Sequence, residues 1–218
     1  AIVVPLRPAL KDVGLAVVTR GTLYFALIGT GFMMVEIGLL QRMTVFLGHP
    51  TYSLSVLLFS LILTTGSGSF LSEKFTLHSR TKITTWAILT GGYLVILPFV
   101  LSELFAAFNH ATLTARIAIC VLSITPAGLL LGFGFPTGMR LITAIDSRPT
   151  PWFWGINGAA GVLASISAIA VSLALGITAT LIAGALCYFL LIPVALALAR
   201  AKGLLESRTS KSPKKQVR

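Results

Sequence analysis

The sequence contains few charged residues and very few acidic ones. Asp, Glu, Lys and Arg together make up 11% of its 218 residues, and only six residues are Asp or Glu. About a quarter of the residues in an average soluble domain are charged. Hydrophobic residues instead make up 56% of this chain. This balance excludes an ordinary soluble domain and indicates an integral membrane protein.

Cysteine is scarce, and the motifs of soluble nucleotide-binding enzymes are missing. The two cysteines, Cys120 and Cys187, both fall in apolar runs, which favours small core residues over an exposed disulfide. The three histidines do not have the spacing of metal ligands. The sequence has no P-loop and no glycine-rich turn between a strand and a helix. We therefore predict no catalytic residue, no cofactor and no metal site in this chain.

Six long apolar runs are present. Each is close to the ~20 residues that a helix needs to cross the hydrocarbon core of a bilayer. The sequence therefore predicts an all-α, polytopic membrane helix bundle with six transmembrane helices over residues 22–199. The expected spans are residues 22–40 (with an extension toward residue 46), 51–71, 83–105, 113–135, 152–175 and 177–199.

Polar and basic segments flank these six runs. Residues 1–21 contain three basic residues and two prolines, which predicts a connector whose first residues resemble the end of an earlier helix. Residues 200–218 are basic and poor in apolar side chains, which predicts a disordered cytoplasmic tail. We expect this tail to bind anionic lipid headgroups, because basic segments beside a membrane are attracted to them.

The basic residues are distributed very unequally between the two ends of the predicted helices. The connector, the second and fourth loops and the tail together hold 15 of the 17 Lys and Arg residues. Only Arg42 and Arg116 fall on the other side. Because positive charge concentrates on the cytoplasmic side of membrane proteins, we predict that both termini are cytoplasmic. The same distribution argues against a nucleic-acid partner.

Small residues recur every three or four positions in the later spans. In the fourth span they form the patterns Gly128-x-x-x-Gly132 and Gly134-x-x-x-Gly138. In the fifth span the stripe consists of Gly158, Gly161, Ser165, Ala168 and Ser172. Stripes of this kind predict close packing between helices in lipid.

One carboxylate, Glu36, lies inside the first span. It is about 14 residues into the run, which places it roughly 20 Å from the cytoplasmic side. A bare carboxylate at this depth is costly, so we expect it to be protonated, paired or in contact with water. Arg116 and the pair Gln41-Arg42 are candidate partners at similar depth. Two interpretations remain: a structural clasp between helices, and a site for a proton or a cation.

Other polar residues lie at the ends of the spans. His49 precedes Pro50 in an outer turn, where it is either a turn residue or a ligand. Asn157 enters the apolar layer and needs a hydrogen bond to another helix or to the interrupted end of the fourth span; with Trp152, it could also line a small pocket. The candidate ligand-binding or intramembrane polar residues are therefore Glu36, Gln41, Arg42, His49, Arg116, Trp154 and Asn157.

A proline interrupts the fourth span close to its cytoplasmic end. Pro136 cannot donate a backbone hydrogen bond, so a freed carbonyl needs another partner. Helices broken at this depth occur at the binding sites of transporters, and they also occur as plain helix ends. Both interpretations of this segment stay open at this point.

Three motifs, in this order, resemble those of a known family. They are YFALIGTGFMMVEI at residues 24–37 followed by Gln41-Arg42, FLGHPTY at residues 46–52, and GFGFPTG at residues 132–138 followed by WGING at residues 154–158. Residues 22–195 resemble the C-terminal membrane region of bacterial multi-span spermidine-synthase-like proteins. In that family, membrane helices flank a cytoplasmic Rossmann-type domain similar to aminopropyltransferases and methyltransferases. The resemblance implies a bacterial inner membrane location and a synthase-like domain before residue 1, which this chain lacks.

Three functional hypotheses follow. The first is a membrane module that anchors a cytoplasmic synthase-like domain or partner and binds a small ligand or lipid between its helices. The second is a small-molecule or proton-coupled transporter. The third is an accessory subunit of a larger membrane complex, docked through its tail and its apolar faces. Under the first hypothesis any aminopropyltransferase activity belongs to a domain outside this chain.

Overall fold

The computed structural model describes residues 14–77 and 79–210, with side chains up to residue 201. All regular secondary structure in these ranges is helical, which confirms the predicted all-α class. The helices are α2 (Leu15–Leu47), α3 (Pro50–Lys74), α4 (Arg80–Ala107), α5 (Leu113–Gly132), α6 (Gly134–Thr143), α7 (Thr150–Leu175) and α8 (Ile177–Ser210). Six stretches are long and apolar enough to cross a membrane, with α5 and α6 together forming the fourth.

The first and last helices are longer than predicted. α2 begins at Leu15, so residues 15–21 of the expected connector are helical. α8 continues to Ser210, so the beginning of the expected disordered tail is helical as well. Both extensions are free of proline, and that of α8 is rich in good helix formers, so neither contains a residue that would force the helix to stop where the apolar run stops. The rest of the predicted connector (1–13) and tail (211–218) lies outside the described residues.

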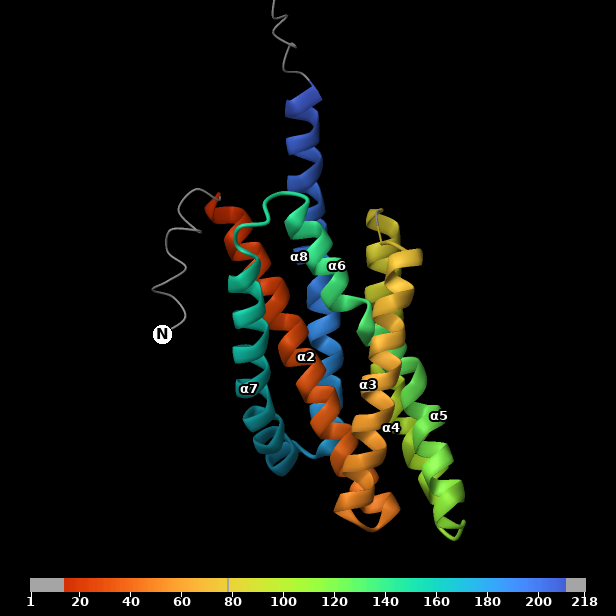
Figure 1. Ribbon diagram of the computed structural model, residues 1–218. Coiled ribbons are helices and arrows are strands. Elements are labelled where there is room, and N and C mark those ends of the chain that lie inside the picture. Colours follow the sequence, from red (N-terminus) through yellow and green to blue (C-terminus); the bar gives the residue numbers. More distant parts are fainter. Residues whose placement is uncertain (1–13, 78, 211–218) are drawn as a thin grey trace, which may run out of the picture.

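Helix α2 lies at the centre of the bundle (Figure 1). Its most extensive contacts are with α7 and α8, whereas α3 packs mainly against α5, and α4 joins the two groups through α8. The α7–α8 turn contains Gly176 with φ +89°. Glycine adopts this left-handed conformation without steric cost, which allows the predicted tight turn between antiparallel neighbours.

Glycines allow the closest approaches between helices, as the sequence predicts. On α5, Gly128 faces Thr64 of α3, and Gly132 faces Thr65 of the same helix. A Cβ added at Gly68 of α3 would lie 2.9 Å from the carbonyl carbon of Leu129. The fifth-span stripe is only partly used for packing, because Gly158 is exposed and has no atom within 4 Å of its missing side chain.

The interruption between α5 and α6 is stabilised by side chains from two other helices. Trp86 of α4 donates its indole N–H to the carbonyl of Leu130 at 2.9 Å, and Tyr24 of α2 donates its hydroxyl to the carbonyl of Gly134 at 2.9 Å. The carbonyl of Leu130 also accepts a bond from the backbone N–H of Phe133 at 3.3 Å, so the indole of Trp86 adds to the backbone bonds at the junction. Pro136 frees the carbonyl of Gly132, which neither side chain reaches, so the prediction that this carbonyl has another partner is not confirmed.

Substitution of Gly68 tests the close contact between α3 and α5. We expect Gly68→Ala to lower the free energy of unfolding in detergent by about 1–3 kcal/mol, because the new methyl group would collide with the α5 backbone. Gly66, on the same helix, has open space around its Cβ position. Gly66→Ala should therefore leave stability unchanged or raise it by up to about 1 kcal/mol through helix propensity. Equal effects of the two changes would contradict this packing.

Candidate functional site

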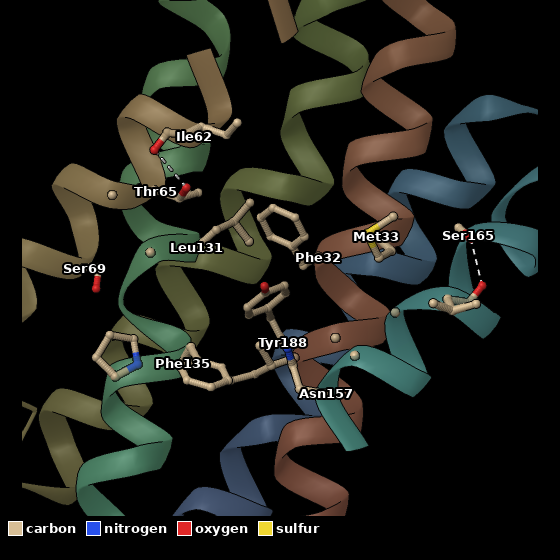
Figure 2. Close-up of a pocket in the computed structure, with 18 residues that line it drawn as sticks. Phe32, Met33, Ile62, Thr65, Ser69, Leu131, Phe135, Asn157, Ser165 and Tyr188 are labelled. Carbon is tan, nitrogen blue, oxygen red and sulfur yellow. Dashed lines mark hydrogen bonds between the residues drawn. The ribbon is translucent and has the colours of Figure 1, made fainter. Parts of the chain in front are cut away.

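A cavity of about 620 Å³ lies between α3 and α7. Figure 2 shows the side chains that line it, which come from both of these helices and from α2, α5, α6 and α8. Ile62 of α3 and Val162 of α7 line opposite sides, and both are more than 60% exposed. In the part of the chain that the structure describes, the cavity is therefore bordered by side chains that face the bilayer.

The lining is mostly apolar. Phe32 and Met33 of α2, Leu131 of α5 and Phe135 of α6 supply large apolar surfaces. Polar groups come from Thr65, Ser69, Ser165, Asn157 and Tyr188. The hydroxyls of Thr65 and Ser165 donate to carbonyls of their own helices. No charged side chain is among the residues that line the cavity.

Tyr188 of α8 is fully buried and lines this cavity. Its hydroxyl has no hydrogen-bond partner among the described residues. The ring is held in place by close helix packing: it lies edge-on to Trp86, and a Cβ added at Gly31 of α2 would lie 3.0 Å from it. In Figure 2 the hydroxyl is directed toward Phe32. The phenol group is thus fixed by its surroundings while its polar atom remains unpaired.

Asn157 is the second polar group with an unpaired atom at this cavity. Its Oδ1 is buried and has no partner in the described chain. Gly29 lets α2 pack directly on the backbone of α7 here, so that an added Cβ would lie 3.1 Å from Oδ1. The expected hydrogen bond to another helix or to the interrupted fourth span is therefore absent. The alternative, that Asn157 lines a pocket, is the arrangement observed.

The two tryptophans near Asn157 do not line the cavity. Trp152 donates its indole N–H to the hydroxyl of Thr22 on α2 at 2.8 Å. Trp154 is 59% exposed and packs edge-on against Phe135, with ring centroids 4.4 Å apart. Trp154 thus packs against Phe135, which lines the cavity, while its own indole is largely exposed on the surface of the bundle.

The interrupted helix forms one wall of the cavity. Leu131 and Gly132 from the end of α5, and Phe135 and Pro136 from the start of α6, all line it. Because Pro136 has no N–H, the carbonyl of Gly132 cannot receive the usual bond from the residue four positions later. This wall of the cavity therefore contains a backbone carbonyl without its usual helical hydrogen bond, in addition to the lining side chains.

Glu36 lies just beyond the cavity. It follows Phe32 and Met33 by one helical turn, so it is on the same side of α2, but it is not among the lining residues. It is partly buried and has no hydrogen bond or ion pair with any described residue. The predicted pairing of Glu36 with Arg116 or with Gln41-Arg42 is wrong.

The arginines at this end bond to hydroxyls and carbonyls instead. Arg42 donates to Ser102 of α4 at 2.7 Å and to Thr178 of α8 at 2.5 Å. Arg116 donates to the carbonyl of Phe46 at 3.1 Å and to carbonyls of its own loop, those of Asn109 and Ala111. Six residues turn a helix by about 240° beyond one full turn, so Arg42 projects from a different face than Glu36.

Two further predicted residues are separate from the cavity. His49 is exposed and caps α3, accepting a hydrogen bond from the backbone N–H of Thr51 at 3.2 Å. This contact supports the interpretation as a turn residue. Gln41 is partly buried near the C-terminal end of α2, and its Oε1 has no partner among the described residues.

Sequence reasoning missed Tyr188, the most deeply buried polar group of the cavity. A signal was available, because tyrosine in membrane proteins is enriched at the two interfaces. Tyr188 instead lies 11 residues after the start of α8 at Ile177, near the middle of an apolar run. A phenol so far from either interface requires a polar partner, and this requirement could have identified it.

Comparisons with protein-family models, curated proteins and solved structures give no match to this chain. Among the described residues, no group of three or more His, Cys, Asp or Glu side chains could hold a metal ion. The chemistry that this site supports follows from its geometry. That geometry is a mainly apolar cavity, bordered by the bilayer, with two fixed and unpaired polar atoms.

Substitutions of Glu36 and Arg42 test whether Glu36 forms a structural ion pair or has no partner. We expect Glu36→Gln to leave the unfolding temperature in detergent unchanged or to raise it, because no partner would be lost. Arg42→Gln should lower the free energy of unfolding by about 1.5–3 kcal/mol, because two charge-assisted bonds between helices would be lost. A loss of stability in Glu36→Gln as large as that in Arg42→Gln would restore the ion-pair interpretation.

Proposed function

We propose that this chain is a membrane module that binds a small, neutral, amphipathic molecule in the cavity between α3 and α7. In the same proposal the bundle holds a cytoplasmic synthase-like domain or partner subunit at the bacterial inner membrane. The observation that carries the ligand-binding part is the buried, unpaired hydroxyl of Tyr188, a residue that lines the cavity. The anchoring part depends on the family resemblance.

The energetic argument starts from the cost of an unpaired polar group. A buried hydroxyl without a hydrogen bond costs about 1–3 kcal/mol. A phenylalanine would fill the same volume without that cost. A bound molecule with a hydrogen-bonding group would offset the cost at Tyr188 and at Asn157 together. The phenol can donate and accept, and the free carbonyl oxygen of Asn157 accepts, so the ligand should carry a donor, as an alcohol or an amide does.

The absence of charge in the lining favours a neutral ligand. An ion moved from water into an apolar site is strongly destabilised unless a group of opposite charge pairs with it. Glu36 lies outside the lining, and no other carboxylate contributes to it. A polyamine therefore does not fit this cavity, whatever reaction a neighbouring synthase-like domain performs. An uncharged molecule that partitions into the bilayer fits better and could enter sideways past Ile62 and Val162.

The anchoring role is supported by the arrangement of the helix ends. The start of α2, the α6–α7 loop and the end of α8 lie at the same end of the bundle (Figure 1). Arg20 of α2 donates to the carbonyl of Ala197 on α8 at 3.5 Å, so the first and last helices are joined there. A domain or a partner subunit attached at this end would be held by two helices at once.

Tyr188→Phe separates ligand binding from structural stability. Purified in mild detergent, the native protein should carry a neutral amphipathic molecule detectable by native mass spectrometry, and Tyr188→Phe should lose it. After the ligand is removed, the unfolding temperature of Tyr188→Phe should equal or exceed that of the native protein, because no hydrogen bond within the protein has been lost.

Tyr93→Phe is the matched control. Its hydroxyl donates to the carbonyl of Ser123 at 2.8 Å, away from the cavity. Its loss should cost about 1 kcal/mol of stability and leave the ligand bound. Asn157→Ala provides a second cavity variant. If Tyr188→Phe and Asn157→Ala both retain the bound molecule, the unpaired atoms are structural and the proposed binding site is wrong.

Transport is a second candidate function, favoured by one observation: the interrupted fourth span lines the cavity. Transport requires flux in addition to binding. Proteoliposomes that contain a pH-sensitive dye should then dissipate an imposed pH gradient faster than empty liposomes, and Glu36→Gln should remove the difference. Glu103→Gln is the control, because Glu103 is exposed on α4. Equal rates of pH-gradient dissipation with and without the protein would contradict transport and leave ligand binding as the proposed function.

A further inference from the structure

A second cavity lies at the end of the bundle where most basic residues gather. It has a volume of about 420 Å³ and is formed by residues of the α3–α4 connection together with α4 and the end of α5. None of its lining residues belongs to the cavity between α3 and α7. Any function of this second cavity is therefore independent of the function proposed above.

The rim of the second cavity is basic and polar. Lys74 is the last residue of α3, and Lys82 lies in the first turn of α4. Both are exposed, and neither forms an ion pair with a described carboxylate. The ammonium group of Lys74 lies 5.7 Å from the ring centroid of Phe70. No acidic residue lines this cavity.

Three threonines add hydroxyl groups to this rim. Thr76, Thr81 and Thr85 all line the cavity. Unlike Thr65 and Thr90, which donate to carbonyls of their own helices, none of the three forms a side-chain hydrogen bond within the described chain. The rim therefore combines two cations with hydroxyls that remain able to donate.

The floor of the cavity is apolar. It consists of Trp86 and Leu89 on α4 and of Leu130 and Phe133 near the end of α5. The bond from the indole of Trp86 to the carbonyl of Leu130, at 2.9 Å, fixes the floor in place. Leu89 follows Lys82 by seven residues, which places it roughly 10 Å deeper along the helix. The cavity thus runs from a basic rim at the helix ends into the apolar layer.

We propose that this second cavity binds one anionic phospholipid. The phosphate would lie between Lys74 and Lys82 and accept hydrogen bonds from the threonine hydroxyls. An acyl chain would cover Trp86 and Leu89. A free anion would leave the apolar floor uncovered, and a zwitterionic lipid would bring a cation toward two lysines that have no acidic neighbour in the cavity. The basic rim and the apolar floor of the cavity therefore favour an amphiphile whose headgroup has a net negative charge.

The fluorescence of Trp86 tests this proposal, because the indole is part of the floor. In a Trp152→Phe, Trp154→Phe background, Trp86 is the remaining tryptophan. The protein is reconstituted in vesicles that contain a small fraction of phosphatidylglycerol or phosphatidylcholine brominated on the acyl chains. Brominated phosphatidylglycerol should quench Trp86 more strongly at equal mole fraction. Equal quenching by the two lipids would overturn the proposal.

Charge variants show whether the preference belongs to this cavity. Lys74→Gln with Lys82→Gln should reduce the relative affinity for phosphatidylglycerol by roughly tenfold, because each basic residue at a membrane surface contributes several-fold. Arg80→Gln with Arg200→Gln removes the same charge at the same end of the bundle, from residues outside the cavity, and should keep most of the preference. An equal loss in both pairs would show general surface attraction and no specific site.

Two further measurements complete the test. Inorganic phosphate at millimolar concentration should not reduce the quenching if the acyl chain contributes to binding. A full reversal by phosphate would identify a simple anion site and would overturn the lipid assignment. If the two tryptophan substitutions prevent folding, native mass spectrometry of the otherwise native protein, with and without the two lysine changes, measures the same preference between the two lipids.

Discussion

A peptide group in the hydrocarbon core of a bilayer has no water with which to form hydrogen bonds, and the whole bundle depends on this constraint. Where the backbone is regular, each helix satisfies its own N–H and carbonyl groups. At the junction of α5 and α6 it is irregular, and Trp86 of α4 and Tyr24 of α2 donate to the carbonyls of Leu130 and Gly134 there. Six buried side-chain atoms of the described residues lack a hydrogen bond, and those of Tyr188 and Asn157 are the two that belong to residues lining the cavity between α3 and α7. Unpaired buried groups of this kind often mark functional sites.

The apolar runs and the small-residue patterns were sufficient to predict the class, the number of spans and several close contacts. Gly128 and Gly132 could be assigned to a helix interface because three- and four-residue spacing places them on one face. The partner of a polar side chain could not be predicted in the same way, since it depends on how neighbouring helices are rotated and packed. Glu36 and Arg42 illustrate this, because they lie less than two helical turns apart but on different faces of α2. Tyr188 was missed because its importance follows from the absence of a partner, which a sequence does not show.

The two cavities differ in the chemistry that they favour, and the difference follows their depth. The cavity between α3 and α7 lies within the bundle, is mostly apolar and has no charged lining residue. The cavity at the α3–α4 connection has lysines at its rim, where the helices end, and an apolar floor. In both cavities the presence or absence of charged lining residues has the same cause: charged groups are tolerated near the headgroups and are costly in the apolar layer. Trp86 lies beside both cavities, because it lines the second one and makes an edge-to-face contact with Tyr188, which lines the first.

The bonds that stabilise the junction of α5 and α6 also have a consequence for biosynthesis. Tyr24 and Trp86 precede Leu130 and Gly134 in the sequence, so a ribosome delivers both donors before either acceptor. When the fourth span enters the membrane, the two side chains that donate to carbonyls at its junction are already there. In a chain with the opposite order, these bonds between helices could form only after later helices arrived. The order of residues along this chain is therefore compatible with inserting the least regular span directly into its final surroundings.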